Sequence, residues 1–392
     1  MHRQRIRHQL AFFIIVRIVL HSSFAMLLTL LPVFARGLNI DILQAGRAIS
    51  VSQLANLVVP FLSMVTERYG YRYGKLLALG VFSLGTSLIL ISQSYAVFIA
   101  TTFLATLGTF IFLPNQGAYF SDLVSFEQRG KVIAISESAW AASLMIGVPV
   151  IAFLIDSTGQ WLVSYATLCI LGAIFFVIIL LSFKPSHPAR EAGTSFVVGL
   201  KFVFKSPLAW AGMILSLILM PSVNLVGTVY GYWLEDTYGL NISALGFASV
   251  VLGAAFLTGT LASAAFTDKL GKIKSIFLGY LINILVASVI FFVNPTLLPA
   301  LVWIFCFYVT AEFGFISGLT MLTELVPQYR TTFLAATTAT SGLGGAFAAY
   351  IAPILYQNGF RANVLAVIVA NLIVMALLFF MARKFNLAGK GW

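Results

Sequence analysis

Between two long apolar runs, the chain carries a short charged segment that reads Thr66-Glu67-Arg68-Tyr69-Gly70-Tyr71-Arg72-Tyr73-Gly74-Lys75. About 200 residues later a related segment follows, Thr267-Asp268-Lys269-Leu270-Gly271-Lys272-Ile273-Lys274. Each segment interrupts hydrophobic sequence at a matching place in one half of the chain. We therefore expect an internal repeat, and we call these two segments the charged turns.

The composition predicts a polytopic membrane protein. Of the 392 residues, 60% are hydrophobic and 9% are charged, and the mean hydropathy is +1.00. In soluble domains, charged residues alone make up about a quarter of the chain. The net charge of +11 comes from short basic clusters between apolar runs, a pattern that indicates membrane topology and not nucleic-acid binding. We expect the lipid bilayer as a partner and no nucleic acid.

Twelve apolar stretches are long enough to cross a bilayer core about 30 Å thick. They lie at residues 11–35, 45–66, 75–93, 96–120, 131–155, 161–183, 208–232, 243–266, 273–293, 299–322, 332–355 and 361–382. The predicted fold class is an all-α protein with twelve transmembrane helices in two pseudo-symmetric six-helix bundles. We place the N-terminal bundle at 1–183, a cytoplasmic linker at 184–207 and the C-terminal bundle at 208–392. Within the linker, residues 196–204 are apolar with lysines near the end, a pattern that predicts an amphipathic helix on the inner membrane surface.

The basic residues predict the orientation. Short loops rich in Lys and Arg stay on the cytoplasmic side, and an inside N-terminus places nineteen of the 23 Lys and Arg residues there. Residues 1–10 are basic and precede an apolar run too long for a cleaved signal peptide, so we expect a retained first helix. The sequence thus predicts a multi-pass protein of the inner or plasma membrane, with both termini and both charged turns cytoplasmic.

An offset of 201 to 202 residues aligns several landmarks of the two halves. It pairs Gly37-Leu38-Asn39-Ile40 with Gly239-Leu240-Asn241-Ile242, Gly70 with Gly271, and Asp122-Leu123-Val124 with Glu324-Leu325-Val326. Such a repeat indicates that six helices were duplicated as two parallel halves, which is the arrangement described for major facilitator folds.

On these residues, the chain resembles a major facilitator superfamily transporter over essentially its whole length. The family signature between helices 2 and 3 resembles Gly-x-x-x-Asp-Arg-x-Gly-Arg-Arg, and the first copy approximates it with Ser63, Glu67, Arg68, Gly70 and Arg72. The second copy, Asp268-Lys269-Leu270-Gly271-Lys272, matches better. The loop at 122–131 and the turn Gly159-Gln160-Trp161 resemble the drug-efflux and sugar-efflux-like branch. Two departures are Thr102, where many proton-coupled exporters carry Arg, and the split helix 5 signature Gly147-Val148-Pro149.

The resemblance implies a conformational gate at the charged turns, formed by Glu67, Arg68, Gly70, Arg72, Asp268, Lys269, Gly271 and Lys272. A carboxylate at the end of one helix can accept hydrogen bonds from the N-terminus of a helix in the other half while the inner side is closed. The alternative is a solvated loop that only sets topology. The recurring carboxylate, Glu67 and then Asp268, favours the gate because a topology signal needs bases alone.

Three charged residues fall inside predicted membrane helices, where a charge costs about 2.5 to 3.5 kcal/mol and is normally paired or functional. Arg17 in helix 1 and Glu137 in helix 5 lie at matching depth, and these helices are neighbours in the family fold. We predict an Arg17–Glu137 ion pair, with His21 one turn from Arg17 on the same face. The alternative is that Arg17 extends to the inner headgroups.

Glu312 lies near the middle of helix 10, which lines the central cavity in this family. A carboxyl group is hard to ionise in an apolar setting, which suits a site for proton coupling or cation binding. The alternative is a protonated Glu that only bonds a neighbouring helix. Asn115 and Gln116 in helix 4 and Asn224 in helix 7 add amides that fit either ligand binding or helix packing. Tyr230 and Trp233 fit an outer aromatic belt.

The sequence contains no His-Glu-x-x-His, phosphate loop or Gly-x-Ser-x-Gly motif, and Cys169 and Cys306 are far apart in apolar runs. We expect no enzyme activity, cofactor, metal or disulfide, and we expect both cysteines to be buried. The predicted function is a monomeric secondary active transporter that moves a small organic solute by alternating access. Proton-coupled efflux, an antiport reaction with Glu312 as proton carrier, is the first choice. The alternatives are uptake of an anionic metabolite, favoured by Arg17 and His21, and a non-transporting membrane receptor or chaperone with the same fold.

Overall fold

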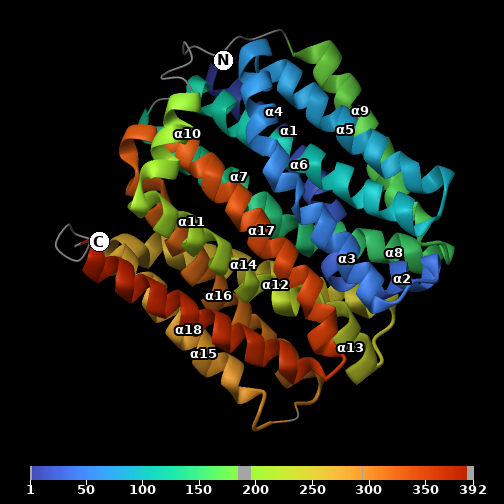
Figure 1. Cartoon of the computed structure of the whole chain (residues 1–392). Coiled ribbons are helices and arrows are strands. Elements are labelled where there is room, and N and C mark those ends of the chain that lie inside the picture. The colour runs from blue at the N-terminus through green and yellow to red at the C-terminus, as the bar shows by residue number, and fades with distance from the viewer. Residues whose placement is uncertain (1, 125, 184–195, 294, 386–392) are drawn as a thin grey trace. The chain divides into compact units, whose positions relative to one another are not determined.

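The computed structural model describes residues 2–124, 126–183, 196–293 and 295–385 (Figure 1). Side chains at 2–7, 63–68, 121–122, 126–131, 133–134 and 196–197 are outside the described set. All regular structure in the described ranges is helical. Twelve helices have the length and apolar composition needed to cross a membrane, which confirms the predicted fold class.

The described residues of the first half form nine α-helices and one π-helical turn. They are α1 (His2–Thr29), α2 (Leu31–Leu38), α3 (Ile42–Gln53), α4 (Ala55–Tyr69), α5 (Tyr71–Ile91), α6 (Tyr95–Leu123), α7 (Phe126–Ala142), η1 (Ser143–Gly147), α8 (Val148–Thr158) and α9 (Leu162–Ser182). The short separation predicted between helices 3 and 4 is confirmed, because α5 ends at Ile91 and Ser94 caps α6 by accepting a hydrogen bond from the Val97 amide. Within this half α5 packs against both α6 and α9.

In the second half, residues 196–293 and 295–385 form a further nine α-helices and a 3-10 turn. They are α10 (Phe196–Lys205), α11 (Pro207–Leu219), α12 (Pro221–Gly227), α13 (Tyr230–Tyr238), α14 (Ile242–Leu270), α15 (Lys272–Val289), α16 (Leu297–Leu325), η2 (Pro327–Tyr329), α17 (Arg330–Tyr356) and α18 (Phe360–Lys384). Here α15 runs beside α16 and α18, and α17 packs along α11 and α12 (Figure 1). Buried apolar side chains of α11, α15, α16 and α18 form the core between them.

The described helices form two compact units. Unit 1 is Met1–Glu191 with Leu240–Gly253, and unit 2 is Ala192–Gly239 with Ala254–Trp392, so the division falls within α14. Residues 184–195 of the predicted linker lie outside the described set. The predicted helix at 196–204 is present as α10, and it packs onto unit 2 through the fully buried Val203 and through Phe202, whose ring lies 4.7 Å from that of Tyr329. The domain limits drawn from the sequence stay a prediction.

The internal repeat extends to the backbone conformation of the two charged turns. Gly70 precedes α5 with φ of 95°, and its aligned partner Gly271 precedes α15 with φ of 86°. Gly159 and Gly359, about 200 residues apart, also share positive φ values of 67° and 90°. Residues with a Cβ rarely adopt this conformation. Gly70 and Gly271 make the same turn, with ψ of 162° and 144°, whereas Gly159 and Gly359 differ in ψ, at 8° and 156°.

Helix 7 is broken where a proline interrupts it. Pro221 lacks an N–H group, so the carbonyl of Leu217 four residues earlier loses its helical hydrogen bond, and α11 ends at Leu219. Gly344 of α17 packs directly on this carbonyl, since a Cβ built at Gly344 would lie 1.9 Å from the Leu217 oxygen. The freed carbonyl therefore faces the backbone of a neighbouring helix.

The expectations for four single residues were wrong. Tyr230 and Trp233 are buried, with Trp233 stacked 4.0 Å from the ring of Phe360, so they do not form an aromatic belt. Cys306 is exposed on α16, and Cys169 is only partly buried. Helix periodicity on an entirely apolar segment does not show which face packs inward, which explains these errors.

Candidate functional site

The predicted ion pair in unit 1 is confirmed. Arg17 of α1 and Glu137 of α7 meet with their Nη1 and Oε1 atoms 3.0 Å apart. The Arg17 side chain is 2% exposed, whereas that of Glu137 is 54% exposed. The guanidinium is thus held inside the helix bundle and does not reach outward. Charge-assisted bonds of this type are roughly twice as strong as neutral ones.

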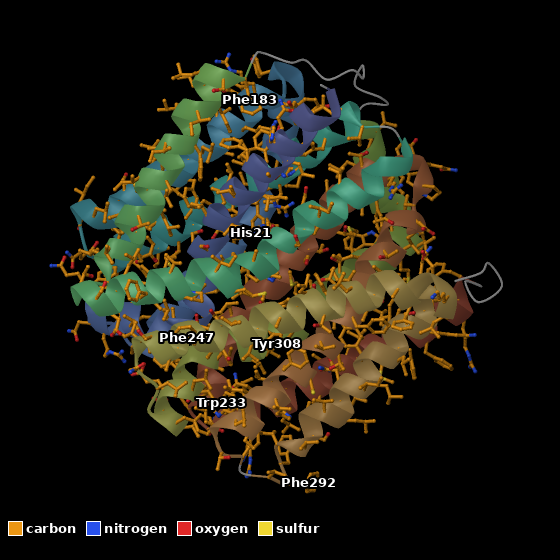
Figure 2. All side chains as sticks on the ribbon, turned by 180° about the vertical axis from the view of Figure 1, so that it is seen from behind. His21, Phe183, Trp233, Phe247, Phe292 and Tyr308 are labelled. Atoms are coloured by element: carbon orange, nitrogen blue, oxygen red, sulfur yellow. The ribbon has the colours of Figure 1, made fainter. Side chains whose placement is uncertain are left out.

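His21 completes this cluster one turn along α1. Its Nε2 atom lies 3.5 Å from Nη2 of Arg17, and its ring packs edge-on against Trp140 at 5.5 Å. Figure 2 shows His21 in the middle part of α1, away from Phe183 at the end of α9. The sequence prediction that Arg17, His21 and Glu137 lie together is therefore correct, while their role in transport stays a prediction.

The two amide side chains of helix 4, Asn115 and Gln116, make different contacts. The Asn115 side chain donates to the Ile111 carbonyl at 2.8 Å and fills the space above Gly74, where a Cβ would lie 2.1 Å from Asn115 Oδ1. The fully buried Gln116 lies 3.5 Å from the Ser136 hydroxyl, next to Glu137 in α7. Asn115 is thus a packing residue between α5 and α6, and Gln116 is the amide nearer to the charged cluster.

Lys75 is a buried cation that the sequence analysis missed. It ends the first charged turn of the sequence, but it lies in the first two turns of α5 and is 2% exposed. Its Nζ atom lies 3.4 Å from the Tyr119 ring centroid and 4.3 Å from that of Phe13, with Phe183 at 6.0 Å. Rings at these distances stabilise an ammonium group through their negative faces. Aromatic residues scattered over three helices give no local sequence signal for such a cage.

Glu312 is buried in unit 2, 6% exposed, in the middle of α16. The Thr260 hydroxyl of α14 donates to its Oε1 atom at 3.0 Å. Gly259 permits this approach, because a Cβ there would lie 2.7 Å from the Glu312 Cβ. Tyr280 of α15 packs on α16 in the same region, since a Cβ built at Gly314 would lie 3.0 Å from the Tyr280 Cε2 atom. The sequence predicts a carboxyl group inside helix 10, and the burial of Glu312 confirms that part of the prediction.

A chain of buried polar side chains links four helices of unit 2. The Ser222 hydroxyl of α12 donates to Asn371 of α18 at 2.5 Å, and the Asn371 amide donates to Asn283 of α15 at 2.8 Å. Asn283 in turn donates to the Phe307 carbonyl at 2.7 Å and to the Thr310 hydroxyl at 2.9 Å. Asn283 and Asn371 were not singled out from the sequence, although an amide inside a membrane helix is a usable signal.

Asn224, in α12 beside the helix break, is 7% exposed. Its Nδ2 atom has no hydrogen-bond partner among the described residues. Next to it, the carbonyl of Val223 accepts a bond from the Tyr308 hydroxyl at 3.3 Å. A buried amide donor without a partner is costly in protein interiors, so Asn224 can donate to a bound ligand.

In each charged turn, one basic residue bonds to a group of its own unit. Arg72 donates to the Leu180 carbonyl at 2.6 Å, and Lys272 pairs with Glu324. Asp268 and Lys269 are exposed. The side chains of Glu67 and Arg68 lie outside the described residues, so their predicted part in a gate is not described. No group of three His, Cys, Asp or Glu side chains that could hold a metal occurs among the residues searched.

Comparison with known proteins gives a consistent result. A model described as the Major Facilitator Superfamily matches residues 13–321. An uncharacterized MFS-type transporter of Bacillus subtilis (strain 168), YceJ, is 26% identical over 352 residues, which cover 88% of each chain. The chromaffin granule amine transporter of Rattus norvegicus is 26% identical over 60% of this chain and 44% of its own length.

Solved structures share the fold at low identity. The nucleoside transporter NupG superposes with a TM-score of 0.73 at 15% identity, covering 97% of this chain and 99% of its own. A D-xylose-proton symporter gives the same TM-score at 17% identity, covering 94% and 96%.

Proposed function

Because the chain belongs to the Major Facilitator Superfamily and is a membrane transporter and not an enzyme, we propose that it exports a small organic cation in exchange for protons. In this proposal the two halves alternate access to a site near the midplane. The protein works as a monomer in the inner or plasma membrane, with both termini cytoplasmic.

The burial of Glu312 is the observation that carries this proposal. A carboxyl group inside a membrane helix binds either a proton or a cation, because an isolated negative charge there is costly. The two ligands therefore compete for one group, and this competition couples their movements. Thr260 supports the ionised form by donating a hydrogen bond to it. Asn224 supplies a donor for a polar atom of the solute.

Two observations favour a cation over an anion as the solute. Arg17, which supported anion uptake as an alternative, is engaged by Glu137 and has its charge compensated. Among the relatives are two named amine transporters, the chromaffin granule amine transporter and the synaptic vesicular amine transporter of Rattus norvegicus. A buried carboxylate is the natural partner for an ammonium group.

The charged turns act as the conformational gate in this proposal. Asp268 is exposed and available to a helix N-terminus once the two halves approach at that side. Gly70 and Gly271 fix the two turns in one conformation, and Arg72 and Lys272 anchor the turns to their own bundles. Loss of the Asp268 charge should shift the balance of open states by about 1 to 3 kcal/mol.

A flux assay tests the function. The full chain in proteoliposomes is offered tyramine and ethidium as cations, D-xylose as a neutral solute and succinate as an anion, each with and without an imposed pH gradient. We expect cation flux that the gradient accelerates in wild type and in Asp236→Asn, an exposed carboxylate of α13 in unit 2, but not in Glu312→Gln. Gradient-driven succinate flux alone would establish the anion alternative, and no flux of any solute would favour the receptor.

A further inference from the structure

Three buried hydroxyl groups form a closed ring between α14 and α16. The oxygens of Ser263 and Thr267 are 2.9 Å apart, those of Thr267 and Ser317 are 2.8 Å apart, and those of Ser263 and Ser317 are 3.2 Å apart. The exposed fractions are 2%, 3% and 0%. Polar groups this deep in a membrane protein require partners, and here each hydroxyl has the other two.

The ring lies on the same face of α14 as the partner of Glu312. Thr260, Ser263 and Thr267 are spaced by three and four residues, which places them on one helix face. Thr260 bonds Glu312, and Thr267 directly precedes the exposed Asp268. At 1.5 Å rise per residue, the row from Thr260 to Thr267 spans about 10 Å. It therefore connects the buried carboxyl group with the charged turn of unit 2.

We propose that Thr260, Ser263, Ser317 and Thr267 form a proton relay between Glu312 and the charged turn at Asp268. The relay rests on the proposed function, since it assumes that Glu312 takes up and releases a proton during transport. Each hydroxyl accepts a proton on its oxygen and passes its own proton to the next oxygen. One proton leaves Glu312 and one proton reaches solvent at Asp268, while each hydroxyl forms one O–H bond and breaks another, so the row is chemically unchanged at the end.

Two steps of the row have no direct contact: the helical turn between Thr260 and Ser263, and the step from the buried Thr267 hydroxyl to the exposed Asp268. The proposal therefore requires a water molecule at each of these two steps, since a proton cannot pass directly over a helical rise of about 4.5 Å. The remaining links are the direct contacts of the ring. The Ser275 hydroxyl of α15 closes the end of the row with bonds to the carbonyls of Gly271 at 2.9 Å and Thr267 at 3.5 Å.

Few ionisable groups compete with Glu312 for the proton. Tyr280 of α15 packs on α16 in the same region, and Tyr308 lies one turn away on α16 itself. The helices α11 and α12, which also pack on α16, contain no ionisable side chain. Helix α13 contacts α16 through Trp233 and Trp303, and it carries Tyr230, Tyr232, Glu235, Asp236 and Tyr238. The other ionisable groups of α14, α15 and α17 lie at or near helix ends: Asp268, Lys269, Lys272, Lys274, Arg330, Tyr350 and Tyr356.

A helix-packing role is the alternative for these hydroxyls, and kinetics separate it from a relay. Time-resolved infrared spectroscopy on the purified full chain follows the protonated carboxyl group after a pH jump, and its absence in Glu312→Gln identifies the Glu312 signal. The relay predicts that Thr267→Val slows proton loss from Glu312 at least tenfold, whereas Ser317→Ala slows it less, because Ser263 still contacts Thr267 directly. The titration midpoint should not move, because neither hydroxyl bonds the carboxyl group. Thr267→Ser, which keeps the hydroxyl, should retain the wild-type rate.

Each outcome decides a separate point. A wild-type rate in Thr267→Val overturns the relay and leaves the proposed function intact. Equal slowing in Thr267→Ser and Thr267→Val also overturns it, because shape and not the hydroxyl then controls the rate. Absence of any titrating Glu312 signal in wild type refutes the proton site of the proposed function itself, and the relay with it. Ser263→Ala provides a second position if one variant fails to fold.

Discussion

The Arg17–Glu137 pair allows a quantitative prediction. At a separation of 3.0 Å, the attraction of two unit charges is about 5.5 kcal/mol at an effective dielectric constant of 20 and about 1.4 kcal/mol in water. Glu137 is 54% exposed, so solvent screens the pair and the net value lies toward the lower limit. We expect a coupling free energy of about 2 kcal/mol, within the range measured for residues in direct contact.

The single variants should differ in cost. Glu137→Gln leaves a guanidinium that is 2% exposed without its counter-charge and should lower the unfolding free energy by about 3 kcal/mol. Arg17→Gln leaves a carboxylate that solvent can reach and should cost about 2 kcal/mol. The double variant should cost about 3 kcal/mol, less than the two single costs together, because neither charge is then left alone.

Equilibrium unfolding in mixed detergent micelles measures all three variants. Arg47→Gln, a change at an exposed base of α3 in the same unit, serves as control and should fall within about 0.5 kcal/mol of wild type. A coupling free energy below about 0.5 kcal/mol would refute the reasoning, since the costs would then be additive and the pair would not stabilise the bundle.

Three further predictions concern packing, and the same unfolding assay measures them. Gly344→Ala places a Cβ 1.9 Å from the Leu217 oxygen and should lower the unfolding free energy by at least about 2 kcal/mol. The control Gly117→Ala has open space around it and should be neutral or stabilising by up to about 1 kcal/mol. Equal effects of the two changes would contradict the close packing at Gly344. Lys75→Met should stay within about 1 kcal/mol of wild type, because an apolar replacement removes the cost of a buried charge. Lys75→Glu should lower the unfolding free energy by about 3 kcal/mol or more, because the carboxylate then faces the negative faces of the rings. A Glu at this position that leaves stability unchanged would exclude the aromatic cage. Asn371→Leu leaves Ser222 and Asn283 without their partner and should cost about 1 to 3 kcal/mol, and a cost near zero would show that the amide chain is dispensable.

The sequence predicted the elements of this fold because membrane helices carry a strong compositional signal. The charged turns located the repeat, and the shared positive φ of Gly70 and Gly271 confirms that alignment. The Arg17–Glu137 pair was also predictable, since two opposite charges at one depth in neighbouring helices have few other partners.

Side-chain environments were harder to predict. Lys75 follows Arg72 by three residues in the first charged turn, where the sequence favours exposure. The rings of Phe13 and Tyr119, from two other helices, nevertheless bury it. The bonds of Asn283 and Asn371 depend on which faces of α15 and α18 meet. Those faces carry no periodicity when the lipid-facing side is equally apolar.

Proton counterflow tests the central claim most directly. Proteoliposomes that hold the full chain and a pH-sensitive dye are loaded with tyramine, and the movement of tyramine and of protons is followed together in wild type and Glu312→Gln. The account predicts proton entry with tyramine exit in wild type and no proton movement in Glu312→Gln. Undiminished proton counterflow in Glu312→Gln would contradict it, because the proton would then be carried by another group.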